Sequence, residues 1–131
     1  MESRMFQVAR VLSPSMQSKL AAHFKDLNPK PLADAPRELM AMGKTIYDEG
    51  ISDAGIAPCS SCHGSDGEGQ REIPRLAGQL YDYILQRFAS WRKEPEANPA
   101  SGDTTAVMEP IAKGLSESQT AAVAAYLSNR E

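Results

Sequence analysis

The sequence predicts an all-α protein with three to four main helices, and three observations predict it. Four segments combine apolar residues at helical spacing with residues that begin or end helices. No stretch alternates polar and apolar residues with β-branched content over more than a few positions, so we expect no strands. Most of the Gly, Pro, Ser and Asp falls in residues 51–78 and 94–114, which we expect to be long loops that wrap a bound group or carry function.

The first two expected helices each begin with a capping residue followed by a proline. Ser13 is the expected N-cap of the first, Pro14 its first residue and Asn28-Pro29 its stop. Its apolar positions are Met16, Leu20, Ala21 and Phe24. Asp34 is the expected cap of the second helix, and Pro36 its start. The apolar positions of that helix, and the glycine expected to end it, are Leu39, Met40, Gly43, Ile46, Tyr47 and Gly50.

The other two expected helices follow the loop segments. The third ends before Pro95, and its apolar residues are Leu80, Tyr81, Ile84, Leu85, Phe88 and Trp91. The fourth begins at a capping box formed by Ser116 and Gln119. Its apolar residues are Val123, Ala124 and Leu127.

Composition excludes several classes of protein. The 131 residues carry a net charge of −3, which argues against nucleic acid as a partner. The longest apolar run, Ala121 to Leu127, is too short to span a membrane. Four Tyr, three Phe and one Trp make a thin aromatic core for a domain of this length. Two cysteines are too few for a disulfide scaffold. The motif in which they lie gives the clearest indication of function.

The two cysteines lie in Cys59-Ser-Ser-Cys62-His63. Thiols three positions apart lie on one side of a helical turn, where each can add to a vinyl group of a haem. The imidazole of the following histidine then lies beneath the porphyrin and can ligate iron. The motif therefore predicts one covalently attached haem c, which also supplies the bulk that the aromatic residues do not.

Three other interpretations of the motif fit less well. A thioredoxin-like dithiol needs a βαβ context, which is missing. A structural zinc site needs four ligands, whereas the chain has two Cys and two His, with His23 far from finger spacing. A disulfide across so short a loop is strained and leaves His63 unexplained.

The sixth iron ligand of an electron-transfer haem is commonly methionine. The candidates are Met1, Met5, Met16, Met40, Met42, Met108 and His23. Met108 differs from the others because it ends a loop rich in Pro and Gly and precedes Pro110, so a flexible loop can bring its sulfur across the ring. We expect Met108 to be the ligand, with a vacant or substituted sixth position as the alternative.

An internal repeat relates the two ends of the chain at a constant offset of 103 positions. Residues 5–24 align without a gap to residues 108–127, with identical Met, Ala, Leu, Ser, Ser, Ala and Ala. One interpretation is that two capped amphipathic helices look alike. The other is that residues 1–28 are the C-terminal end of a preceding domain of the same kind, in which Met5 corresponds to Met108.

With these residues in place, the chain resembles a class I c-type cytochrome over residues 36–131. The resemblance rests on the order of elements: a helix with Gly43 and Tyr47, the motif with Gly64, the run Ile73-Pro-Arg-Leu-Ala-Gly-Gln79, Met108 and a final helix with Tyr126. It implies that the carbonyl of Pro74 accepts the second ring N–H of His63. It also implies that the first and last helices cross at Gly43 and Tyr126.

The resemblance is closer still to the dihaem subgroup of the c-four type, and in particular to its C-terminal haem domain. The two halves of that subgroup share the Ile-Pro-Arg-Leu-Ala-Gly-Gln run and a Met-x-x-Ile-Ala…Leu-Ser ending. Because the subgroup has two haem domains in tandem, this resemblance accounts for the internal repeat. We expect residues 1–28 to be the end of a neighbouring domain, 29–35 a Pro-rich linker and 36–131 the haem c domain. The alternative is a single-haem protein with an added helix. We expect the N-terminal helix to pack on the haem domain or on a second copy of the chain.

The expected function is electron transfer by iron that cycles between Fe(III) and Fe(II), with no enzymatic activity. Arg75 is the candidate to neutralise the haem propionates, and Tyr81, Tyr83 and Trp91 are more simply core residues. One alternative is an open-site haem sensor or peroxidase, which applies if Met108 does not ligate iron. Another is the haem subunit of a dehydrogenase complex.

Location and partners follow from the resemblance alone. It implies a bacterial periplasmic protein that needs a signal peptide, and the start of this chain does not show the pattern of one. The implied partners are redox proteins: a quinol-oxidising complex as donor and a terminal oxidase or reductase as acceptor, with association to a membrane complex or self-association through residues 1–28.

Overall fold

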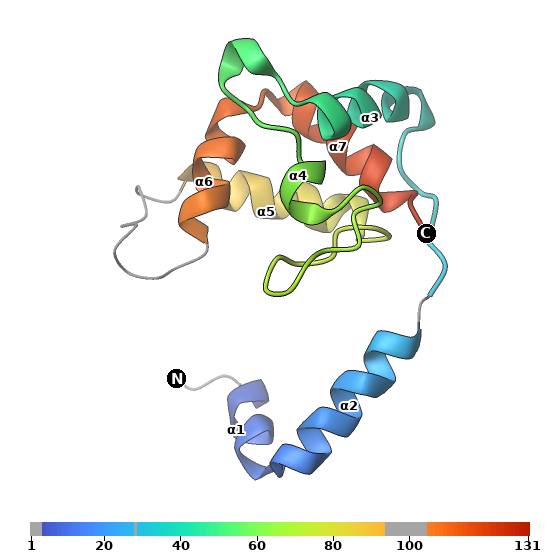
Figure 1. The fold of residues 1–131 in the computed structure, drawn as a ribbon, viewed down its shortest axis with the longest axis vertical. Coiled ribbons are helices and arrows are strands. Elements are labelled where there is room, and N and C mark those ends of the chain that lie inside the picture. Colours follow the sequence, from blue (N-terminus) through green and yellow to red (C-terminus); the bar gives the residue numbers. More distant parts are fainter. Residues whose placement is uncertain (1–3, 28, 94–104) are drawn as a thin grey trace.

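The computed structural model describes residues 4–27, 29–93 and 105–131, and this part of the chain is helical (Figure 1). The elements are α1 (Arg4–Val11), α2 (Pro14–Leu27), η1 (Arg37–Leu39), α3 (Met40–Glu49), η2 (Ser52–Ala54), α4 (Ser60–His63), α5 (Tyr81–Lys93), α6 (Thr105–Gly114) and α7 (Glu117–Ser128). Extended pairing in these residues is limited to two isolated bridges, Ile51 with Ile56 and Gln70 with Ile73. None of the described helices is long and apolar enough to cross a membrane. The all-α prediction is confirmed.

The ends of α2, α3 and α7 test the capping predictions. The Ser13 hydroxyl accepts the Met16 amide at 3.2 Å, as expected of an N-cap. The capping box of α7 is complete, because the Gln119 amide donates to Ser116 Oγ and the Ser116 amide donates to Gln119 Oε1. Gly50 ends α3 with a φ of 70°. The prediction for Asp34 is wrong: the chain enters α3 through the 3-10 turn η1, with no side-chain cap.

Helix α7 is the centre of the part of the chain expected to be the haem domain, and every residue from 122 to 128 is buried. It crosses α3 at Gly43, where an added Cβ would lie 1.9 Å from the Ala122 carbonyl oxygen and 2.8 Å from Tyr126 Cβ. Only a residue without a side chain allows this approach. The expected contact between Gly43 and Tyr126 is therefore present.

The segment 94–114, expected to be a loop, contains helix α6, and Met108 lies inside this helix. The expectation that Met108 ends a flexible loop is wrong, whereas residues 94–104 lie outside the described residues. Pro110 is tolerated within α6 because its missing N–H removes a single intrahelical bond. Packing offsets this loss, since Ala112 of α6 is wholly buried and Leu115, just after the helix, is nearly so. Tertiary packing holds the helix in spite of the proline.

The N-terminal helices α1 and α2 stand apart from the haem domain (Figure 1). Neither helix buries a residue, and α1 was not foreseen as a separate helix. Their exposed apolar side chains are Met5, Phe6, Val8, Val11, Met16, Leu20, Phe24 and Leu27. The expectation that this segment packs on the haem domain of its own chain is therefore wrong, and packing on a second copy stays a prediction.

Candidate haem site

The Cys-x-x-Cys-His motif forms the single turn α4. The His63 amide donates to the Cys59 carbonyl at 2.9 Å, and the Cys62 amide reaches the same oxygen at 3.3 Å. Both cysteines are free thiols, with Cys59 partly buried and Cys62 exposed. Burial raises the pKa of the Cys59 thiol, so it stays protonated at neutral pH. The turn thus presents two unpaired thiols next to the histidine.

The ring of His63 is held by a backbone carbonyl. His63 is 6% exposed, and its Nδ1 lies 2.9 Å from the Pro74 carbonyl oxygen. Because a carbonyl oxygen can only accept, Nδ1 carries the proton and Nε2 keeps its lone pair. A hydrogen bond of this kind fixes the tautomer and the ring orientation of a metal-binding histidine.

The loop that supplies Pro74 is folded back on α4 by its own backbone. The Gly69 amide donates to the His63 carbonyl at 2.8 Å, and Gln70 and Ile73 pair with each other. Gly69 has a φ of +79°, and an added Cβ would lie 2.7 Å from the Arg75 amide nitrogen. The position therefore requires glycine. Sequence reasoning did not single out Gly69, although a glycine in so polar a loop is the pattern that marks such a turn.

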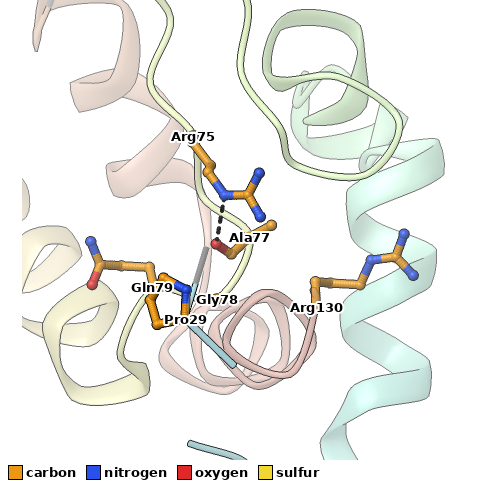
Figure 2. Close-up of a pocket in the computed structure, with 6 residues that line it drawn as sticks. All are labelled: Pro29, Arg75, Ala77, Gly78, Gln79 and Arg130. Atoms are coloured by element: carbon orange, nitrogen blue, oxygen red, sulfur yellow. Dashed lines mark hydrogen bonds between the residues drawn. The ribbon is translucent and has the colours of Figure 1, made fainter. Parts of the chain in front are cut away.

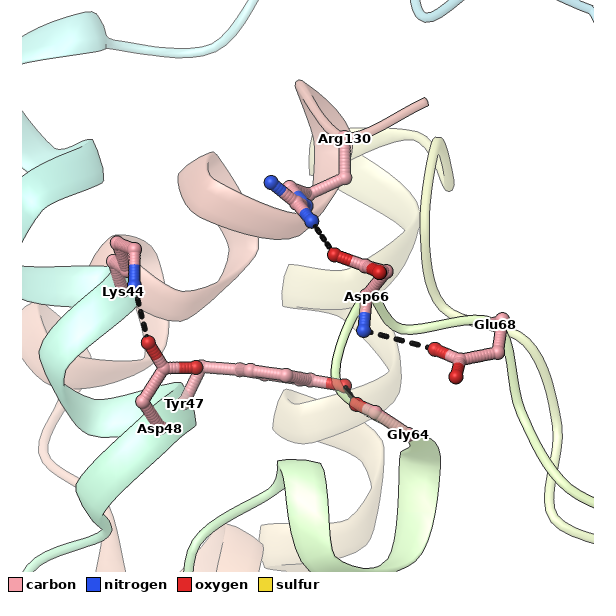
Figure 3. A network of polar contacts seen from close by, with 7 residues as sticks. All are labelled: Lys44, Tyr47, Asp48, Gly64, Asp66, Glu68 and Arg130. Carbon is pink, nitrogen blue, oxygen red and sulfur yellow. Dashed lines mark hydrogen bonds and ion pairs between the residues drawn. The ribbon is translucent and has the colours of Figure 1, made fainter.

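Tyr47 joins α3 to the end of the motif (Figure 3). Its side chain is fully buried, and its hydroxyl donates to the Gly64 carbonyl at 2.6 Å. Burial raises the pKa of Tyr47 to about 12, so the phenol remains a donor at neutral pH. The sequence placed Tyr47 on the buried face of a helix without this role.

Charged residues surround this hydrogen bond on the surface (Figure 3). Arg130 forms an ion pair with Asp66, and Lys44 forms one with Asp48. The Glu68 carboxylate accepts the Asp66 amide at 2.8 Å, and backbone hydrogen bonds lower the pKa of Glu68. The Arg130–Asp66 pair ties the loop after the motif to the C-terminal end of the chain, whereas the Lys44–Asp48 pair lies within α3. Such exposed pairs contribute little stability singly.

Met108 lies on α6, partly buried and packed against the apolar core. Glu109 beside it is 3% exposed and forms an ion pair with Lys113, a buried carboxylate that the sequence did not reveal. Hydrogen bonds of the described residues link Cys59, Cys62, His63 and Pro74. Met108 and Cys59 both pack against the apolar core.

Arg75, which follows Pro74, lines a pocket together with residues from the linker and the C-terminal end of the chain (Figure 2). It is exposed, and its Nε donates to the Ala77 carbonyl at 3.3 Å. The pocket has a volume of about 210 Å³, and its lining residues, drawn in Figure 2, are Pro29, Arg75, Ala77, Gly78, Gln79 and Arg130. No residue of the motif lines this pocket.

The aromatic residues of α5 divide between core and surface. Tyr81 and Trp91 pack against the apolar core, as expected, whereas Tyr83 is 49% exposed. Trp91 meets Phe88 edge to face, and the Arg87 guanidinium lies over its ring. Its buried indole N–H has no hydrogen-bond partner in the described part of the chain. A bound group with oxygen acceptors is one way to satisfy such a donor.

The chemistry of these side chains suits haem c better than a simple metal ion. No group of three or more His, Cys, Asp or Glu that could hold a metal ion occurs among the described residues. What the site offers is two free thiols, an imidazole with Nε2 available and a partly buried thioether. These are the groups that attach a haem and ligate its iron on both faces.

A sequence model of the cytochrome c family matches residues 40–131, which include the motif, Met108 and helix α7. The chain belongs to the cytochrome c family. The family implies a covalently bound haem c and electron transfer.

Individual relatives extend this match to the N-terminal helices. Cytochrome c-552 of Acidithiobacillus ferridurans is 35% identical over 129 residues, which are 98% of this chain and 53% of that protein. The thiosulfate dehydrogenase electron acceptor of Thiomonas intermedia is 31% identical over 123 residues, 92% of this chain and 55% of that protein. The chain thus spans about half the length of these relatives.

The fold also matches solved cytochromes. The cytochrome c4 structure from Acidithiobacillus ferrooxidans has a TM-score of 0.74 and 33% identity, over 96% of this chain and 70% of that one. The class I cytochrome c fold is therefore confirmed.

Proposed function

We propose that this chain is an electron carrier that holds one haem c through Cys59 and Cys62, with His63 and Met108 as axial ligands. The observation that carries the proposal is the buried His63, whose Nδ1 proton goes to the Pro74 carbonyl at 2.9 Å. Its Nε2 is thereby presented to iron in one orientation. The expected role of Pro74 agrees with this geometry.

Each residue of the proposed haem site has a separate role. When bound, the haem supplies one-electron chemistry at iron that alternates between Fe(III) and Fe(II). The Cys59 and Cys62 thiols form the thioether bonds, and the Met108 thioether favours the reduced state. Tyr47 anchors the backbone directly after His63. Arg75 stays the candidate to offset propionate charge: its side chain is exposed, and its Nε donates to the Ala77 carbonyl.

This proposal assigns no catalytic residue. With His63 and Met108 both as ligands, the iron would have no position left for a substrate, and the haem would only take up and release electrons. Haem in a carrier of this kind accepts and donates electrons without opening its coordination shell. The open-site sensor or peroxidase is the alternative in which Met108 stays off the iron.

The experiment uses two pairs of matched variants of the haem-loaded chain. Met108→Ala is expected to abolish the weak far-red sulfur-to-iron absorption band of the oxidised protein, whereas Met42→Ala, at an exposed methionine, keeps it. His63→Ala is expected to lose low-spin haem, whereas His23→Ala, on the exposed face of α2, keeps it. A wild-type protein without the far-red band and with high-spin features contradicts electron transfer and favours the open site.

The partners we propose are redox proteins of the bacterial periplasm. A quinol-oxidising complex is the expected donor and a terminal oxidase or reductase the acceptor. A second candidate donor is a dehydrogenase of a sulfur compound, favoured by the relative named as a thiosulfate dehydrogenase electron acceptor. Stopped-flow reduction of the oxidised chain by each purified donor separates the two: the true donor reduces it faster, and the rate falls as salt rises if charge guides docking.

We propose further that residues 1–28 form the C-terminal end of a preceding cytochrome c domain. The repeat places Leu20 over Val123 and Phe24 over Leu127. Phe24 is 66% exposed, whereas Leu127 is 2% exposed against the haem domain. The N-terminal helices thus carry the pattern of a buried helix pair without the surface that would bury it. The linker 29–35 and the haem domain 36–131 follow.

A further inference from the structure

Arg92, near the end of α5, reaches across to the junction between α6 and α7. Its Nε donates to the Ala112 carbonyl at 2.9 Å, and one Nη donates to the Leu115 carbonyl at 3.0 Å. The same Nη contacts the Ser116 carbonyl at 3.4 Å and bonds to the Thr120 hydroxyl. One side chain therefore joins three elements of the fold.

Two of the three carbonyls that Arg92 contacts, those of Ala112 and Leu115, lose their backbone donors at the helix junction, whereas the Ser116 carbonyl accepts the Thr120 amide. In a continuous helix the Ser116 amide would serve Ala112, and the Gln119 amide would serve Leu115. The capping box redirects both amides, one to Gln119 Oε1 and the other to Ser116 Oγ. The fork of N–H groups on the Arg92 guanidinium donates to both of these carbonyls in place of the missing amides.

These contacts are well placed to be strong. Ala112 is fully buried, and Leu115 and Thr120 are 4% and 2% exposed. A cation at the C-terminal end of α6 also interacts favourably with the helix dipole. Leaving such carbonyls buried and unpaired would cost more than the bonds contribute.

The hydrogen bond from Arg92 to the Ala112 carbonyl affects the position of Met108 through the geometry of α6. Residues four apart in a helix lie on the same face, so Met108 lies one turn from the clamped carbonyl. Pro110, between the two, removes one intrahelical bond and leaves α6 less able to hold its own shape. The position of Met108 therefore depends on where the end of α6 is held.

We propose that Arg92 is the positioning residue for Met108: by clamping the end of α6 to α5, it holds the thioether where it can ligate iron. This inference rests on the proposed function, in which Met108 is the sixth ligand. Arg92 itself touches neither the motif nor Met108 in the contacts described, and it acts through Ala112 and Leu115.

The experiment measures how easily added imidazole displaces Met108 from the oxidised, haem-loaded chain. Arg92→Lys keeps the charge but cannot bond both carbonyls at once, so we expect about tenfold tighter imidazole binding. Thr120→Val removes one acceptor and should shift binding in the same direction by less. Lys93→Ala, which removes an exposed charge next along α5, is the matched control and should leave the affinity as it is.

The outcomes distinguish failure of the proposed role of Arg92 from failure of the proposed function. A wild-type protein with no far-red band contradicts Met108 ligation and therefore the proposed function. If the wild-type protein shows the band, but Arg92→Lys and Thr120→Val bind imidazole within about twofold of the wild-type affinity, only the role of Arg92 is overturned. Equal tightening in Gly78→Ala, which is strained by a φ of +75° and whose new Cβ would meet Arg130 rather than α6, would also overturn it, because general destabilisation would then explain the change.

Discussion

The phenol of Tyr47 donates a 2.6 Å hydrogen bond to the carbonyl oxygen of Gly64, the residue directly after His63. Tyr47 is fully buried on α3, and its ring also packs at 5.4 Å against Tyr126 of α7. The contact therefore joins the crossing of the first and last helices to the turn that carries the motif. Tyr47 thus links the packing of α3 on α7 directly to the backbone next to His63.

Tyr47→Phe should lower the free energy of unfolding by about 0.5–1.5 kcal/mol, because the buried Gly64 carbonyl then keeps only the longer, 3.3 Å hydrogen bond from the Gly67 amide. Guanidinium unfolding followed by circular dichroism measures the change. Tyr83→Phe removes the same hydroxyl from a half-exposed ring and should have little effect. Equal stability of wild type and Tyr47→Phe would show that the bond contributes nothing.

The same phenol makes stability depend on alkaline pH. Folding raises the pKa of Tyr47 from 10.0 to about 12, mainly through burial. The unfolded chain releases this proton first, so the contribution is complete below pH 10 and is lost as pH rises toward 12. The wild-type stability should fall more steeply over this window than that of Tyr47→Phe, and parallel curves would contradict the assignment.

Gly43→Ala should destabilise the haem domain by about 3 kcal/mol or more, because the new Cβ has no room at the helix crossing. Ala122 is backbone at that contact, so it cannot move aside as a flexible side chain would. Gly55→Ala is the control: its Cβ meets open space, and only its φ of +68° costs about 1–2 kcal/mol. Thermal unfolding of both variants compares them directly, and equal losses would argue against a tight crossing.

Deleting residues 1–27 should leave the stability and haem content of the remaining chain unchanged within about 0.5 kcal/mol, because α1 and α2 bury nothing. Sedimentation analysis of the full chain should show association that the deletion abolishes, since the exposed apolar face is then gone. A large loss of stability on deletion would show that the N-terminal helices pack on the haem domain after all.

Features that depend on local chemistry were predictable from the sequence. The Cys59–His63 turn, the N-cap at Ser13 and the capping box at Ser116 follow from residue types at fixed spacing. The crossing at Gly43 came from the family resemblance. The geometry around Pro74 agrees with the same resemblance.

Features that depend on tertiary packing were not predictable. Pro110 favoured a loop by local rules, yet burial of neighbouring residues keeps Met108 in a helix. Asp34 is a good capping residue, but the 3-10 turn before α3 begins only after Pro36, whose backbone is extended. The bonds of Arg92 and Tyr47 span many positions, and no local pattern encodes them.

The central claim is that one haem is covalently attached at Cys59 and Cys62 in this chain. The most direct measurement is the pyridine haemochrome spectrum of the protein matured with a c-type haem attachment system, read against protein concentration. We predict one haem per chain that resists acid-acetone extraction and shows the spectrum of two thioether bonds, and its loss in a variant with both cysteines replaced by alanine. Haem that is extracted by acid-acetone, or a wild-type chain that holds none, would contradict the account.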